Sequence, residues 1–281
     1  MAKGNLLLGT AGNSVGDVVM YRREGAQVSR VRVRKIKNPK TDAQSLQRAA
    51  FSPVAKFYSP LAVVLERSFE GLSKMKSYNK FLKTNIYLAR KNGWLLPKGT
   101  GFVPLPYQLS QGSLPAMNYS VNPSATELVI NSVPAQTAPT TMGDLTALFE
   151  AVGISGFDVV TIILVQNDRI GWEGNHVPTA IQFQGSGDDT TLAQQFPNLT
   201  FSVTEGKLSI KFKTGKTEAG AVIVARYEND KWRRSTQYLE VCHSVVEEIE
   251  QLKENAIASY GTEEHGGNAL VYLDGTELAK D

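Results

Sequence analysis

Cysteine and histidine are scarce in this 281-residue chain, which has one cysteine and three histidines. The lone Cys242 excludes an internal disulfide, which fits a reducing compartment or a particle assembled in one. His176, His243 and His265 lie far apart, and none has a second His, Cys or carboxylate at zinc-ligand spacing. We therefore expect surface or strand histidines, a buried structural thiol at Cys242, and no metal or other cofactor. Cys242 and His243 are adjacent, so in a strand they would point to opposite faces and form no nucleophile–base pair.

Long hydrophobic runs are also absent. The longest, 159–165, has the length of a strand and falls far short of the roughly 18–20 apolar residues of a membrane helix. The segment 1–8 has one lysine and too short an apolar core for a signal peptide. With 42% hydrophobic and 20% charged residues, the composition predicts a folded soluble protein without a membrane span.

Acidic residues are few in the first third of the chain. Residues 1–100 contain 19 Lys and Arg against 5 Asp and Glu, a balance of +14, whereas residues 101–281 contain 11 against 22, a balance of −11. This asymmetry predicts that the first third faces nucleic acid, a phosphate-rich surface or the acidic part of a neighbouring copy. The alternative is that these cations only solvate helix faces, although such faces normally mix both signs.

The basic residues begin in a glycine-rich arm and hairpin over 1–37. Four glycines in the first sixteen residues predict a loop, and 17–23 and 26–36 then read as two strands joined at Glu24-Gly25. Alternation in the second strand places Arg30, Arg32 and Arg34 on one face at intervals of about 7 Å, close to the phosphate spacing of an extended nucleic-acid strand. Tyr21 could stack on a base or fill a local core. The predicted nucleic-acid-binding residues are Arg22, Arg23, Arg30, Arg32, Arg34, Lys35, Lys37 and Lys40.

A helical segment is expected over 38–96. The spacing of Thr41 and Gln44 is that of a capping box, and Ser52-Pro53 and Ser59-Pro60 each resemble a helix start with proline at the first position. These signals predict short or kinked helices over 42–71, followed by a longer helix over 74–91 that ends at Asn92-Gly93.

The rest of the chain reads as a linker and a β-rich domain. Prolines and glycines dominate 97–115, which we expect to be the linker. The expected strands span 117–122, 126–133, 157–166, 178–184, 199–204, 207–213, 220–228 and 232–241. A helix is expected over 144–152 and another over 244–258, with a small hairpin over 270–278. The fold class is thus α+β: a basic hairpin and short helices, an antiparallel β-sandwich-like domain over 116–241, and a helix and hairpin over 242–281.

Patterns that could carry chemistry are weak. The glycines of 9–16 resemble a phosphate loop but lack the Gly-Lys-Ser/Thr ending, and a strand rather than a helix follows. Asp188-Asp189 reads as a polar turn, since the other oxygen ligands of a calcium loop are missing. Trp172 is either an exposed recognition aromatic or a packed loop anchor. We therefore expect no enzyme activity, and no catalytic or metal residues.

The N-terminal pattern also resembles a known family. Gly12-x-x-Val15-Gly16-Asp17-Val18-Val19, and then Asn38-Pro39-Lys40-Thr41-x-x-Gln44-x-x-x-Arg48, are similar to motifs of uncharacterised proteins from Bacteroidota and their phages. Those proteins share a Phe-rich helical stretch, here Phe51 to Phe69, an aliphatic Ser-x-Gly-x-Leu strand, here Ser110 to Leu114, and a β-sandwich-like C-terminal part. The resemblance implies a structural or accessory, phage-associated protein and supplies no catalytic residue.

These observations predict a structural component of a bacteriophage particle, of coat, ring or connector type. Its partners would be copies of itself, other particle proteins and DNA or RNA, with no membrane, and it would reside in the virion after assembly in the bacterial cytoplasm. A nucleic-acid-binding accessory protein outside any particle is the alternative. An enzyme that uses the β-domain, for example to act on glycans, is the third.

Overall fold

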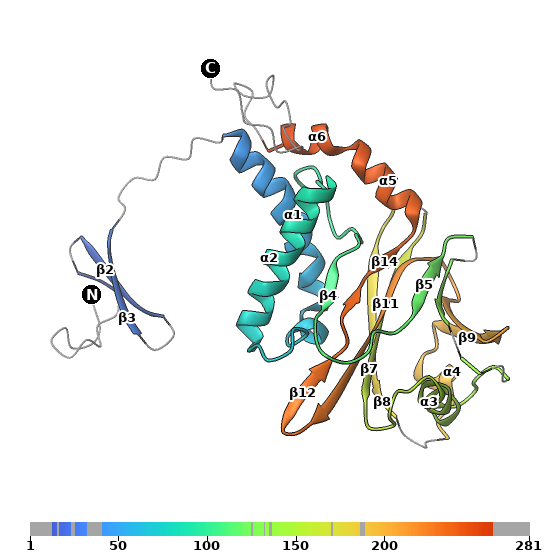
Figure 1. The fold of residues 1–281 in the computed structure, drawn as a ribbon. Coiled ribbons are helices and arrows are strands. Elements are labelled where there is room, and N and C mark those ends of the chain that lie inside the picture. Colours follow the sequence, from blue (N-terminus) through green and yellow to red (C-terminus); the bar gives the residue numbers. More distant parts are fainter. Residues whose placement is uncertain are drawn as a thin grey trace. The chain divides into compact units, whose positions relative to one another are not determined.

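The computed structural model describes residues 13–15, 17–23, 26–32, 41–124, 126–131, 133–134, 137–169, 171–185 and 189–260. They belong to two compact units, Met1–Lys40 and Thr41–Asp281, and each unit is described by itself. Helices and antiparallel sheets occur together, so the predicted α+β class is confirmed (Figure 1).

The first unit is a three-stranded antiparallel sheet in the order β1-β2-β3, with β1 Asn13–Val15, β2 Val18–Arg23 and β3 Ala26–Val31. Arg23 pairs with Ala26 and Val18 with Val31, so the predicted hairpin is confirmed. β1 lies in the glycine-containing stretch that was expected to be a loop. The glycine content was therefore a poor guide there, because a three-residue strand needs only a partner edge to pair with.

Two long helices open the second unit, α1 Asp42–Leu65 and α2 Lys74–Asn92. Thr41 caps α1 through the Gln44 amide at 3.4 Å, as expected, but the Gln44 side-chain oxygen is buried without a partner and does not return the bond. In place of the short or kinked helices expected over 42–71, one helix runs from Asp42 to Leu65, with Pro53 and Pro60 both inside it. α2 buries one residue per turn and ends at Gly93, whose positive φ of 73° fits the predicted cap.

The β-rich part forms two main antiparallel sheets. The first has the order β5-β6-β10-β9: Tyr119–Asn122, Glu127–Ile130, Lys207–Phe212 and Leu199–Thr204. The second has the order β12-β11-β7-β8, with β14 also on β11: Lys231–Arg234, Lys216–Glu228, Val159–Asn167, Val177–Gln184 and Glu240–Val241. β4 Gln108–Ser110 pairs separately with β13 Gln237–Tyr238. The helices α3 Met142–Ala151, α4 Leu192–Gln195, α5 His243–Gln251 and α6 Lys253–Ala258 complete the fold.

The two sheets pack against each other. A Cβ on Gly220 of β11 would lie 2.9 Å from Leu128 of β6, so glycine permits this close approach. β7 and β11 are buried along almost their whole lengths, which indicates cover on both sheet faces, since a half-covered strand alternates. Figure 1 shows α1 and α2 side by side on one flank of this sheet and β5 and β9 on the other. The arrangement is compatible with the predicted β-sandwich.

Helices and sheets share one hydrophobic core. The stretch 97–115, expected to be a linker, contributes Val103, Leu105, Tyr107 and Leu109, each at most 1% exposed. The expected strand 232–241 is divided into β12, β13 and β14, because the chain leaves one sheet to pair with β4 and then returns. The expected helix 244–258 is broken at Leu252, and the expected hairpin 270–278 lies outside the described residues.

Candidate polyanion-binding surfaces

The basic hairpin presents different side chains on its two faces. Pairing of Val19 with Arg30 and of Tyr21 with Val28 puts Tyr21 and Arg30 on one face, and alternation adds Arg32 to it. The Arg30 guanidinium lies 6.0 Å from the centroid of the Tyr21 ring. Arg22 pairs with Gln27 and projects from the opposite face. Arg30, Tyr21 and Arg32 therefore form the basic face of the first unit, and Arg22 does not.

The structure does not place the other predicted cations on the basic face. It does not describe the side chain of Arg23. Four further predicted residues lie outside the described residues: Arg34, Lys35, Lys37 and Lys40. The basic face is thus defined by two of the eight predicted cations.

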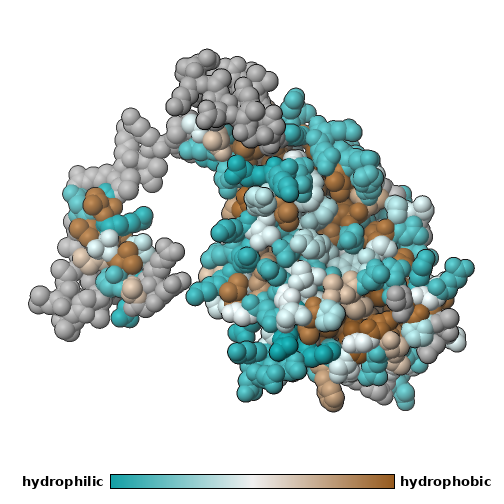
Figure 2. Space-filling view, viewed as in Figure 1, coloured by the Kyte–Doolittle hydropathy of each residue, from teal (hydrophilic) through white to brown (hydrophobic). Residues whose placement is uncertain are grey.

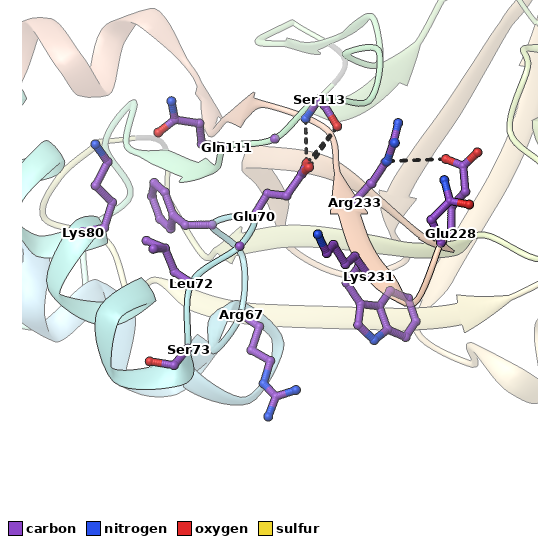
Figure 3. A pocket seen from close by; sticks show the side chains of 15 residues that line it. Arg67, Glu70, Leu72, Ser73, Lys80, Gln111, Ser113, Glu228, Lys231 and Arg233 are labelled. Carbon is purple, nitrogen blue, oxygen red and sulfur yellow. Dashed lines mark hydrogen bonds and ion pairs between the residues drawn. The ribbon is translucent and has the colours of Figure 1, made fainter. Parts of the chain in front are cut away.

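A second basic surface lies in the Thr41–Asp281 unit and was not predicted as a site. It is an open groove of about 1290 Å³ between the α1–α2 connection, the loop 111–113 and the β11–β12 hairpin (Figure 3). We call it the basic groove. Its charged lining residues are Arg67, Glu70, Lys80, Glu228, Lys231 and Arg233.

A two-residue turn places the hairpin side of the basic groove. Asn229 and Asp230 have φ of 52° and 59°, the left-handed pair that a type I′ turn requires and that Asn and Asp tolerate. The turn lies between the strands expected over 220–228 and 232–241, and Glu228 pairs with Lys231 across it. Figure 2 shows hydrophilic residues gathered at this tip. The turn thereby fixes Lys231 and Trp232 at the edge of the sheet.

Glu70 fastens the floor of the groove. Its carboxylate accepts hydrogen bonds from the Ser113 amide at 2.8 Å and the Ser113 hydroxyl at 3.0 Å (Figure 3). It also accepts one from the Arg234 amide at 3.3 Å. Burial alone would raise the pKa of Glu70, but these hydrogen bonds outweigh it and hold the pKa below its usual value. Glu70 is therefore occupied in joining three segments. Gly112 allows the approach, since a Cβ there would lie 2.2 Å from the Arg234 carbonyl oxygen.

The cations of the groove are only partly neutralised. Arg233 pairs with Glu228 at 3.5 Å, whereas Arg67, Lys80 and Lys231 pair with no carboxylate in the part of the chain that the structure describes. Burial and the nearby charge of Arg67 lower the pKa of Arg234, which lies just behind the groove. The groove thus concentrates positive charge that a bound anion would offset.

Aromatic rings adjoin these cations. Trp232 lines the groove and is 41% exposed, and its cross-strand neighbour Tyr227 is 58% exposed with the ring centroids 5.4 Å apart. Arg234 lies 6.0 Å from the Trp232 ring. The indole is therefore held from two sides while much of it remains open to solvent.

The expectation of a surface or strand position is wrong for His176, which is buried and lies just before β8. Its side chain is buried, and its Nδ1 lies 2.6 Å from the buried Glu218 carboxylate and its Nε2 3.1 Å from the Trp172 carbonyl oxygen. Glu218 is the extra residue of a β-bulge in β11, which turns its side chain out of the regular alternation. It also accepts from the Gly171 amide at 3.1 Å and from Asn167 at 3.0 Å. Burial would lower the pKa of His176, but the hydrogen bond and charge of Glu218 outweigh it and raise the pKa.

Other residues considered from sequence have ordinary surroundings. Cys242 is buried, as expected, and His243 is an exposed residue that pairs with Glu247 at 3.0 Å. Trp172 is a packed loop anchor, since it lies against the core and its amide donates to Glu248. His265, Asp188 and the glycines of 9–16 lie outside the described residues. Within the described ranges, no three His, Cys, Asp or Glu side chains gather as metal ligands, and no helix has the length and apolar character to cross a bilayer.

Sequence separation explains why the groove was missed. Lys80 and Lys231 are far apart in the chain, and only the fold brings them to one hollow. A partial signal was present in α2, which carries six Lys or Arg residues and no acid. Lys76, Lys80, Lys83, Tyr87 and Arg90 recur at alternating steps of four and three, so they share one exposed helix face.

Comparison with known proteins places the N-terminal part of the chain in a family match. Residues 9–92 match a family of unknown function (DUF6266). The matched stretch includes β1 to β3, α1 and α2, and it stops at Asn92, the last residue of α2. It is less than a third of the chain and leaves the β-rich part unmatched. No curated protein and no solved structure matches the chain.

Proposed function

We propose that this protein is a non-enzymatic structural component of a bacteriophage particle that assembles with copies of itself through the β1–β2–β3 sheet. One observation carries the proposal: the three strands form a compact unit, yet they bury none of their own described side chains. Val31 is 74% exposed and Tyr21 40% exposed. Because small sheets need a hydrophobic partner surface to be stable, another copy is the expected source of cover.

The edge of β3 provides a means of assembly. The backbone N–H of Arg32 donates to the Asp17 carbonyl oxygen. In an antiparallel pair every second residue bonds to the partner strand, so the backbone groups of Arg30 and Val28 also face β2. The backbone N–H of Ser29, which lies between them, therefore points away from β2. An edge of unpaired N–H and C=O groups recruits a further strand by β-augmentation. The phage setting is supported by the motif resemblance, and the match over 9–92 includes β1, β2 and β3.

The basic face would contact nucleic acid or an acidic neighbour within the particle. Arg30 and Arg32 lie on it with Tyr21, and Arg22 on the opposite face gives a matched control. Replacing Arg30 and Arg32 with Ser should reduce the slope of log affinity against log salt by about 1.8 for duplex DNA, since each lost phosphate contact contributes about 0.9. Arg22→Ser should change it less. Equal slopes for all variants would contradict this part of the proposal.

Light scattering after size-exclusion chromatography tests the assembly. The full chain should form a defined oligomer, and both deletion of residues 1–37 and Ser29→Pro should lower its mass, because proline removes the outward N–H without disturbing the bonds to β2. Ser29→Ala is the matched control and should assemble normally. A monomeric parent, or an oligomer that both changes leave intact, would overturn the proposal. A monomer that still binds DNA would favour the accessory-protein alternative.

A further inference from the structure

We propose that the basic groove of the Thr41–Asp281 unit binds single-stranded nucleic acid, with a base stacked on Trp232 and phosphates held by Arg67, Lys80 and Lys231. The inference does not depend on assembly or on the basic face of the first unit. It rests on the size of the groove, its unpaired cations and its exposed aromatic ring.

Charge selects an anion. The two carboxylates in the lining are already engaged, Glu70 by three donors and Glu228 by Arg233. Arg67 and Lys80 belong to the helical wall, whereas Lys231 belongs to the hairpin wall, so a ligand between them meets cations on both sides (Figure 3). That arrangement suits a chain of phosphates better than a single small anion.

The indole selects an unpaired base. Every base has a flat face that stacks on an aromatic ring, and in a duplex those faces are covered by neighbouring bases. Trp232 is held by Tyr227 and Arg234 and remains 41% exposed, so stacking requires little rearrangement. An acidic or phosphorylated peptide would use the same cations but would not need the ring.

The groove continues on to α2. Lys80 lines the groove and also belongs to the exposed helix face formed with Lys76, Lys83, Tyr87 and Arg90. Because the fourteen steps of helix from 76 to 90 rise about 21 Å, this face can follow several nucleotides along α2. Tyr87, 64% exposed, offers a second stacking surface on the same path.

Titration of a dye-labelled twelve-nucleotide oligothymidylate, followed by fluorescence anisotropy, measures the affinity of every variant, and tryptophan emission is recorded in parallel. All proteins are full chains that carry Arg30→Ser and Arg32→Ser, so that the first unit does not mask the groove. Oligonucleotide should quench the tryptophan emission, and Trp232→Phe should bind about as tightly without that quenching. Trp232→Ala should bind about tenfold more weakly, the loss expected for one stacked base. Lys80→Glu with Lys231→Glu should also weaken binding and lower the salt slope by about 1.4.

Matched controls share the chemistry but lie elsewhere. Lys207→Glu with Lys211→Glu changes two exposed lysines of β10, and Phe157→Ala removes an aromatic that is 85% exposed; both should bind like the parent. Circular dichroism verifies that every variant is folded. The proposal is overturned if no complex with the oligonucleotide forms, if the groove variants bind it like the controls, or if a duplex of equal length binds as tightly with the same quenching. It is also overturned if an acidic phosphopeptide binds the groove more tightly than the oligonucleotide does.

Discussion

The buried pair of His176 and Glu218 should be a large contributor to stability, and His176→Leu tests this directly. The substitution leaves the Glu218 carboxylate buried with two remaining donors, the Gly171 amide and the Asn167 side chain. Removing one partner of a buried ion pair costs about 3–5 kcal/mol, and the remaining donors place the expected loss near 3 kcal/mol. For a folded unit of this size that corresponds to a lowering of Tm by roughly 6–12 °C.

The loss should depend on pH in one direction. The pKa of His176 is raised in the folded protein, so the stabilisation is fully present below the unfolded value of 6.5 and is lost as the pH rises through the folded pKa. The difference between parent and His176→Leu should therefore be larger at pH 6 than at pH 9. Urea unfolding followed by circular dichroism at these two values measures it.

Two controls define the result. His243→Leu removes an exposed histidine that also pairs with a glutamate, and it should cost less than about 0.5 kcal/mol. His176→Leu combined with Glu218→Leu should recover part of the stability, because no buried charge is left without a partner. A cost below about 1 kcal/mol for His176→Leu at pH 6, or a cost that grows with pH, would refute the reasoning.

Three further changes test the packing of the Thr41–Asp281 unit. Asn85→Ala removes two buried hydrogen bonds, at 2.9 and 2.7 Å, to the β4 backbone and should destabilise by about 2–4 kcal/mol in urea unfolding. Gly112→Ala forces a Cβ to within 2.2 Å of the Arg234 carbonyl oxygen and should lower Tm by several degrees, whereas Gly101→Ala meets nothing within 4 Å and should not. A fragment beginning at Met117 lacks α1, α2 and residues 94–109 of the shared core, so we expect no cooperative thermal transition; a sharp transition would instead support a separate β-domain.

Local periodicity was sufficient for most of the fold. Strands such as β9 and β10 carry a period of two around the Glu205-Gly206 turn, where both residues have positive φ, so the hairpin could be predicted to the residue. The two Ser-Pro pairs of α1 led to the prediction of helix starts at these positions. The same local pattern also occurs inside a helix, where Pro53 and Pro60 in fact lie. What decided there was the core: Val54, Phe57 and Leu61 bury one continuous face across both prolines.

Non-local features could not be predicted. β4 forms only by pairing with β13, more than 120 residues later in the chain. The basic groove forms because the fold brings Lys80 and Lys231 to one hollow. No local sequence pattern predicts either arrangement. Glu218 reaches His176 only because a bulge changes the direction of its side chain. The basic face, by contrast, arises within one hairpin, which is why alternation alone could place Arg30 and Arg32.

The pairing of β4 with β13 also affects how the chain is made. The Asn85 side chain holds the Gln108 backbone of β4. The strand that pairs with β4, however, ends only at Tyr238. The Lys98 amide donates to the hydroxyl of Ser259, which follows later still in the chain. Contacts this distant in sequence slow folding, because the intervening loop must close first. At synthesis rates of about 5–20 residues per second, roughly 8–30 s separate the emergence of Asn85 from that of Tyr238. During that interval the apolar faces of α1 and α2 are available to a chaperone before the rest of their own core exists.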